Sequence, residues 1–267
     1  MLVGINGPEK STMKTIDKCA MQQKIVTNVL ASLRLEKLTP SLGIVEGLQA
    51  YLAGESTPEK LLVEARNYPL TEERQPNSFR YSKSTAVKNK AGINDQRALD
   101  VFEINATAIR LVEIDLHPVP GGFNMAHLKA IYQHLFQDVY SWAGKLCSET
   151  IRESDRIPLG NWERNENHLG GELDLIYKEN FLIGSSPDHF VERLAHYMGQ
   201  INIALPFREG NGRIQRTFCN QLAKQANYFI DYSEMEYREW LWAMATNFRH
   251  DSKPLESLLG RSIAIIE

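Results

Sequence analysis

Residues 205–216 read LPFREGNGRIQR, in which Gly210 and Gly212 lie close to Arg213 and Arg216. Gly210 and Gly212 let the backbone turn tightly and approach a ligand closely. A helix that begins directly after them presents its free N–H groups to that turn. Arg213 and Arg216 are three residues apart, so both lie on one face of this helix. The pattern predicts an anion site that suits a polyphosphate.

Glu209 is an acidic residue in this otherwise positive segment. A carboxylate there is best explained if it holds Mg²⁺, which bridges phosphate oxygens. The plainer interpretation is a helix start with a glycine turn and two surface arginines, and the residues by themselves leave both open. The segment is not a P-loop, because the GxxxxGK(S/T) pattern is absent.

The same segment resembles the signature of the Fic family, HPFx(D/E)GNGRxxR, at every motif position except the first. Other stretches between about residues 81 and 266 also look like Fic sequence, namely Lys88–Lys90 with Gly92 and Ile93, Phe136–Gly144, and Ala195–Asn202. Fic proteins are helical and mostly transfer AMP from ATP to a Ser, Thr or Tyr hydroxyl of a target protein. The resemblance therefore implies a protein adenylyltransferase with ATP as substrate, Mg²⁺, and a target protein as partner.

The resemblance implies a role for each motif residue. Glu209 would coordinate Mg²⁺. The anion hole for the α- and β-phosphates would be formed by Gly210, Asn211 and Gly212. Arg213 would contact the β-phosphate region and Arg216 the γ-phosphate.

The resemblance also implies two supporting elements. Phe207 would be a packing anchor of the nucleotide site. A hairpin around Thr150–Pro158 would be the flap that registers the target segment by strand addition.

Leu205 occupies the position of the family's histidine, the general base for the target hydroxyl. Leucine cannot accept a proton, and losing a general base costs ~10²–10⁴ in rate. The expected catalytic positions Glu209, Asn211 and Arg213 would still hold ATP and stabilise phosphate charge. We therefore expect an intact nucleotide site with transfer largely abolished. Two alternatives stay open, a nucleotide-binding pseudoenzyme that acts as a regulatory or protein-binding module, and a different transfer chemistry such as removal of AMP.

Ser32 and Glu36 are four residues apart near the end of the first predicted helix and share a face. By themselves they are typical of a solvent-facing pair. The Fic family, however, is regulated by an inhibitory helix with the pattern (S/T)xxxE(G/N), whose glutamate pairs with the second signature arginine. Here Lys37 stands at the last position. The resemblance implies that Glu36 pairs with Arg216 and occupies the space of the γ-phosphate.

Hydrophobic spacing predicts an all-α protein. The resemblance implies that it is a Fic-type helical bundle with a small β-hairpin flap, preceded by a three-helix module that looks like the antitoxin partner of Fic toxins. The expected domains are residues 1–66 for this inhibitory module, 67–90 for a linker and entry segment, and 91–267 for the Fic domain. Helices are expected at residues 15–38, 40–53, 58–66, 95–116, 124–136, 162–181, 187–201 and 213–227, and around 240–244.

The composition excludes several function classes. The chain has 267 residues with 30 basic and 33 acidic side chains, and a net charge of −3 argues against general nucleic-acid binding. No apolar run approaches the ~20 residues of a membrane helix, and the polar N-terminus lacks a signal peptide. The three cysteines, Cys19, Cys147 and Cys219, have no CxxC spacing. We therefore expect a reducing compartment, the bacterial cytoplasm, with delivery into a host cell also open.

Overall fold

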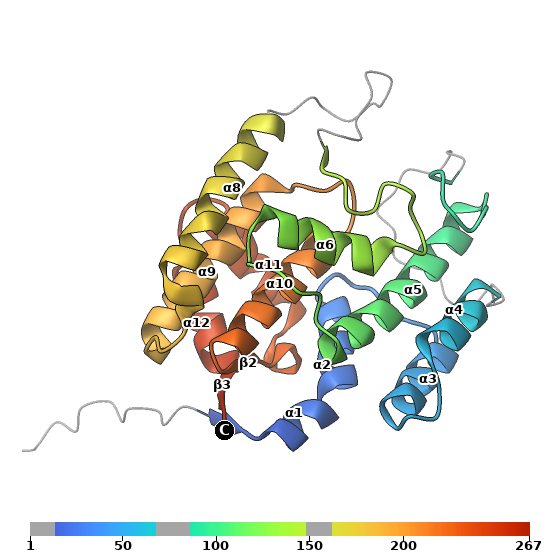
Figure 1. Ribbon diagram of the computed structural model, residues 1–267, viewed down its shortest axis with the longest axis horizontal. Helices are drawn as coiled ribbons and strands as arrows, with labels where there is room; N and C mark the ends of the chain where they lie inside the picture. The colour runs from blue at the N-terminus through green and yellow to red at the C-terminus, as the bar shows by residue number, and fades with distance from the viewer. Residues whose placement is uncertain (1–13, 68–85, 148–161) are drawn as a thin grey trace, which may run out of the picture.

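The structure is a computed structural model of the chain that describes residues 14–67, 86–147 and 162–267 (Figure 1). Helices dominate the N-terminal part, after one short strand. The elements there are β1 (Lys14–Ile16), α1 (Lys18–Gln23), α2 (Ile25–Arg34), α3 (Leu42–Leu52) and α4 (Pro58–Arg66).

The remaining elements are again mainly helical, which confirms the predicted fold class. They are α5 (Gln96–Leu116), α6 (Met125–Phe136), α8 (Trp162–Lys178), η1 (Asn180–Leu182), α9 (Pro187–Ala204), α10 (Asn211–Gln225), β2 (Tyr228–Ile230), η2 (Tyr232–Glu234), α11 (Tyr237–Asn247), α12 (Lys253–Ser262) and β3 (Ile263–Ile266). None of these helices is both long and apolar enough to cross a membrane. The hairpin flap expected at residues 150–158 lies outside the described residues.

Side-chain caps explain where several helices begin. The Asp95 carboxylate accepts the N–H of Ala98 at 2.8 Å and starts α5. Asn124 caps α6 in the same way through the N–H of His127 at 3.1 Å. Ser186 precedes α9, whose first residue is Pro187. Each cap satisfies a backbone donor that the first turn leaves without a partner, and these predicted starts are confirmed.

The single helix predicted over residues 15–38 is wrong. The chain first forms β1, and Asp17 then caps the short α1 by accepting the N–H of Ala20 at 2.8 Å. Lys24 separates α1 from α2, and its ammonium group pairs with Asp231. The hydrophobic period belongs only to α2, where Val26 and Leu33 are fully buried, while α1 buries none of its residues.

A three-stranded sheet in the order β1-β3-β2 joins the first described residues to the last. β1 runs parallel to β3 with Thr15 opposite Ile265, and β2 runs antiparallel to β3 with Phe229 opposite Ala264. Hydrophobic spacing did not predict this sheet, nor did it predict α12. The sheet anchors the segment that leads into α2 beside the C-terminal end of the molecule (Figure 1).

α10 is the central helix. It packs against α9, α6, α5, α2 and β2, and most of its side chains are buried. α2 packs against α5 and η2, and α3 and α4 also pack on α5. This packing brings the end of α2 to the beginning of α10.

Candidate functional site

The loop before α10 is held by a reciprocal pair of hydrogen bonds. The Phe207 N–H donates to Asn211 Oδ1 at 3.0 Å, and Asn211 Nδ2 donates to the Phe207 carbonyl at 2.6 Å. The Phe207 side chain is buried, and its ring lies 4.3 Å from the ring of Tyr132, centroid to centroid. The predicted packing anchor is therefore buried, and the Asn211 amide is used to shape the turn.

Both glycines of the turn lie in close contact with other side chains. Gly210 has φ +73°, in the left-handed region, and an added Cβ would lie 2.1 Å from Phe136 Cζ. An added Cβ on Gly212 would lie 2.6 Å from Glu36 Oε1. Glu36 therefore reaches the first turn of α10, where free N–H groups and the helix dipole favour negative charge.

Arg213 is almost completely buried, at 4% exposure. Its Nη2 donates to Glu103 Oε1 at 2.9 Å and its Nη1 to Thr107 Oγ1 at 3.0 Å, both on α5. Its Nε lies 3.6 Å from Glu36 Oε2. The guanidinium also lies over the Phe136 ring, 4.8 Å from the ring centroid.

Arg216 is buried one turn further along α10, at 2% exposure. Its Nε donates to Ser32 Oγ at 2.7 Å, and its Nη2 donates to Glu36 Oε1. The predicted pair of Ser32 and Glu36 therefore shares one arginine. The guanidinium carbon also lies over the Trp240 ring, 5.7 Å from the ring centroid.

The charges in this cluster stabilise one another. Burial raises the pKa of the Glu36 carboxyl, but the positive charges of Arg216 and Arg213 outweigh it, so the pKa lies below its ordinary value. Burial lowers the pKa of Arg213, and the charges of Glu103 and Glu36 reverse this effect and raise it. Glu36 is therefore ionised at neutral pH and acts as a built-in anion.

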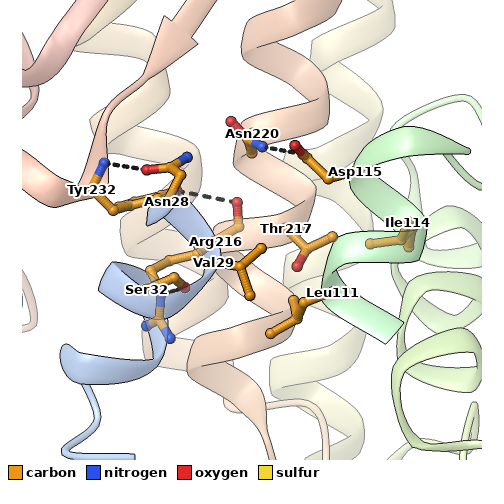
Figure 2. A pocket seen from close by; sticks show the side chains of 10 residues that line it. All are labelled: Asn28, Val29, Ser32, Leu111, Ile114, Asp115, Arg216, Thr217, Asn220 and Tyr232. Carbon is orange, nitrogen blue, oxygen red and sulfur yellow. Dashed lines mark hydrogen bonds between the residues drawn. The ribbon is translucent and has the colours of Figure 1, made fainter. Parts of the chain in front are cut away.

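A small cavity of about 30 Å³ lies behind Arg216, between α2, α5, α10 and η2 (Figure 2). It is lined by Asn28, Val29, Ser32, Leu111, Ile114, Asp115, Arg216, Thr217, Asn220 and Tyr232. This volume suits one or two water molecules. Asn220 Oδ1 is buried there and accepts no hydrogen bond from the described residues, so a water molecule fits the lining.

Leu205 ends α9 in the left-handed region, at φ 43° and ψ 58°. Its side chain is 42% exposed, at the other end of the loop from the arginines. An aliphatic side chain there neither accepts nor donates a proton.

Glu209 is the single carboxylate of the loop 206–210. In the described chain no cluster of three or more His, Cys, Asp or Glu side chains is arranged to hold a metal ion. Mg²⁺ is commonly bound through one or two carboxylates together with substrate phosphates. The donor set at Glu209 therefore fits an ion that arrives with a polyphosphate.

The sequence analysis did not identify Glu103 and Thr107, which hold Arg213. The available signal was a charged residue on the apolar face of a helix, because Glu103 stands four residues after Leu99 and three before Ala106, which are both fully buried. Such a residue is rarely buried unless it is paired. The sequence could not name its partner, which lies 110 residues away.

Comparisons with known proteins agree with this architecture. The Fic/DOC family model matches residues 122–223. Protein adenylyltransferase VbhT of Bartonella schoenbuchensis is 34% identical over 175 residues, which are 66% of this chain and 36% of VbhT. This chain therefore spans about a third of the length of VbhT.

A second relative matches over nearly its whole length. The probable protein adenylyltransferase Fic of Escherichia coli is 32% identical over 178 residues, which are 67% of this chain and 88% of that protein. The N-terminal Fic domain of a Bartonella quintana effector, solved with bound ADP, has a TM-score of 0.58 at 27% identity and covers 70% of this chain and 94% of its own. By the extent of these matches, this chain belongs to the Fic/DOC family.

Proposed function

We propose that this chain is a Fic-type protein adenylyltransferase that is inhibited by its own α2 segment and weakened by Leu205. The observation that carries the proposal is the position of Glu36, whose carboxylate pairs with Arg216, faces Arg213 and lies against Gly212. Relatives that are named protein adenylyltransferases, and a neighbour solved with ADP, support this activity.

The nucleotide site would be the first turn of α10. The N–H groups of residues 210–212 would face the α- and β-phosphates, where a helix N-terminus stabilises negative charge. Arg213 and Arg216 would bind the more distal phosphate oxygens. Glu209 would hold Mg²⁺, which supplies neutralisation of the phosphate charge when it is bound.

In the proposed reaction the oxygen of a target hydroxyl attacks the α-phosphorus of ATP. The bond from that phosphorus to the β-phosphate oxygen breaks and pyrophosphate leaves, while the hydroxyl proton must pass to a base. The family signature places a histidine there, and this chain has Leu205. Transfer should therefore be slower by about 10²–10⁴ than in a chain with the histidine.

Inhibition by Glu36 would follow from charge and space. The carboxylate pairs with Arg216 and would repel the γ-phosphate. ATP would therefore bind with its α-phosphate misplaced for in-line attack. The inhibitory segment belongs to the same chain, and an effective concentration on the order of mM keeps such a segment docked. We therefore propose that residues 1–66 act as an antitoxin-like module in cis.

Transfer of label from α-³²P-ATP to protein in a bacterial lysate tests the activity. We expect little labelling with the unchanged chain, more with Leu205→His, and most with Leu205→His combined with Glu36→Gly. Leu205→Ala is the matched control, because it removes leucine without adding a base and should give no gain. Equal labelling by the unchanged chain and by Leu205→His would contradict the inactivity, and equal labelling with and without Glu36→Gly would contradict the inhibition.

A second candidate function is supported by Leu205 itself. A nucleotide-binding pseudoenzyme would need the arginines and the glycine turn but no base, and it would recognise a partner without modifying it. Under that function Leu205→His would restore no transfer, while Mg-ATP would still bind to the Glu36→Gly chain. If a product forms, its mass on the modified protein distinguishes adenylyl transfer from another transfer chemistry.

A further inference from the structure

The two site arginines are held by different parts of the molecule. The hydrogen bonds of the Arg213 guanidinium go to α5, to Glu103 and to Thr107. Among the described residues, the guanidinium of Arg216 donates only to Ser32 and Glu36, which belong to α2 and the turn after it. Departure of the α2 segment would therefore leave the Arg213 hydrogen bonds intact and remove those of Arg216.

Glu103 is itself fixed in place. One carboxylate oxygen accepts a hydrogen bond from Arg213, and the other accepts one from the hydroxyl of Tyr140. Burial and the charge of Glu103 raise the pKa of Tyr140 far above its ordinary value, so its hydroxyl remains a donor. The Tyr140 ring stacks with the rings of Phe136 and Trp142, at centroid distances of 6.1 and 4.6 Å. The carboxylate therefore has a hydrogen-bond partner on each of its two oxygens.

The charges of the site differ depending on whether Glu36 is present in it. With Glu36 in place, as in this structure, the guanidiniums of Arg213 and Arg216 face two carboxylates, Glu36 and Glu103. When Glu36 leaves, the site gains one net positive charge, and Glu103 still orients one of the two arginines. Orientation before the substrate arrives lowers the cost of reaching the reactive geometry.

We infer that Glu103 is a positioning residue that holds Arg213 in one orientation in both the inhibited and the open state. Arg216, by contrast, takes its orientation from Ser32 and from whichever anion occupies the site, first Glu36 and then the nucleotide. The inference about Arg213 and phosphate rests on the proposed function. The anchoring itself does not, and it can be tested without any reaction.

The crystal structure of the full-length Glu36→Gly chain tests the anchoring directly. We expect Arg213 to keep its hydrogen bonds to Glu103 and Thr107, and the Arg216 guanidinium to move from the place it has here. If Arg213 rotates away from Glu103, or if Arg216 remains in place with Ser32 as its only partner, the inference is overturned. This result does not depend on catalytic activity.

Kinetics test the consequence in the chain that carries Leu205→His and Glu36→Gly. Glu103→Gln should lower kcat for adenylyl transfer by about tenfold or more, because Arg213 loses its orientation. KM for Mg-ATP should change by less than about threefold, because the lost negative charge compensates for the lost order. Glu103→Asp, which keeps the charge on a shorter side chain, should recover part of kcat. An unchanged kcat would refute the positioning role. So would a KM for Mg-ATP that rises by the same factor as kcat falls.

Glu113→Gln is the matched control, since Glu113 also lies on α5 and pairs with an arginine, Arg110, at 2.7 Å. It should leave kcat unchanged in the same background. If that background shows no transfer with Glu103 intact, the proposed function fails and the crystal structure alone decides the inference. A dislodged Arg213 together with full activity would keep the function and overturn the inference.

Discussion

Glu36 has surroundings unlike those of an ordinary surface carboxylate. Two guanidiniums and the first turn of α10 face it, and the glycine at position 212 leaves the space that its oxygen fills. A substitution that removes the charge leaves two buried arginines with one fewer partner. Breaking a buried ion pair by removing one member typically costs about 3–5 kcal/mol.

The stabilisation from Glu36 should depend on pH. Its pKa in the folded chain lies below the ordinary value of 4.5, so the carboxylate binds fewer protons when folded than when unfolded. The stabilisation is therefore fully present above pH 4.5 and is lost as the pH falls through the lower, folded value. We expect Glu36→Gln to be less stable by about 3 kcal/mol at pH 7 in urea unfolding, with the difference shrinking only below pH 4.5.

Glu192→Gln provides the comparison for that experiment, because Glu192 is an exposed carboxylate on α9. Its difference from the unchanged chain should stay near zero at every pH. A Glu36→Gln difference that is absent at pH 7, or that disappears between pH 7 and 5, would contradict the depressed pKa.

At the scale of single elements, α2 is held by one buried amide as well as by its apolar face. Asn28 Nδ2 donates to the Ile230 carbonyl at 3.0 Å. Its Oδ1 accepts the Tyr232 N–H at 2.7 Å (Figure 2). The side chain is 5% exposed, so water cannot replace it freely. Asn28 thus satisfies the backbone between β2 and η2 and aligns α2 for the contacts of Ser32.

Asn28→Ala should loosen α2, the helix that we propose to be inhibitory. It leaves a buried carbonyl and a buried N–H without partners, and each such loss costs about 1–3 kcal/mol. We expect the free energy of unfolding to fall by at least about 2 kcal/mol, and transfer to rise when the change is made together with Leu205→His. Thr27→Ala, on the exposed face of the same helix, should change neither quantity. A loss of stability without any gain in transfer would separate Asn28 from the inhibition.

The elements that the sequence predicted well are those with local signals. Three helices are capped by Asp95, Asn124 and Ser186, and each cap accepts the N–H of the residue three positions later. Contacts this local can be predicted from the sequence. The sheet could not be predicted in this way, because β1 and β3 have three and four residues and pair across most of the chain. Large sequence separation also explains why the partner of Glu103 could not be predicted, since Arg213 lies 110 residues away.

The turn after α2 contains a residue with a left-handed backbone conformation, at the position where the family pattern has glycine or asparagine. Lys37 has φ +58°, in the left-handed region, which glycine and asparagine adopt most readily. The resemblance expected one of those two residues at this position. The Lys37 ammonium lies 4.7 Å from the centroid of the Tyr237 ring, a cation–π contact that offsets part of the backbone cost.

At the scale of the whole molecule, the N-terminal segment and the rest of the chain share one hydrophobic core. Val26 and Leu33 of α2, Leu48 of α3 and Leu61 of α4 all belong to the same buried cluster as the side chains of α5 and α10. Strand pairing between β1 and β3 adds a connection at the opposite end of α2 from Glu36. The division into modules at residue 66 stays a prediction, and the packing makes cooperative unfolding the expectation for residues on both sides of it.

Calorimetry of the full chain should therefore show one transition, and Leu33→Ala should move all of it. Leu33 is fully buried, and replacing such a leucine by alanine costs about 2–5 kcal/mol. A chain of this size shifts its Tm by about 2–4 °C per kcal/mol, so we expect a decrease of about 5–15 °C. Val63→Ala, at a 62% exposed position of α4, is the control and should leave Tm nearly unchanged. Two transitions, of which only one responds to Leu33→Ala, would show that the N-terminal segment unfolds by itself and that its release costs only the contacts of α2.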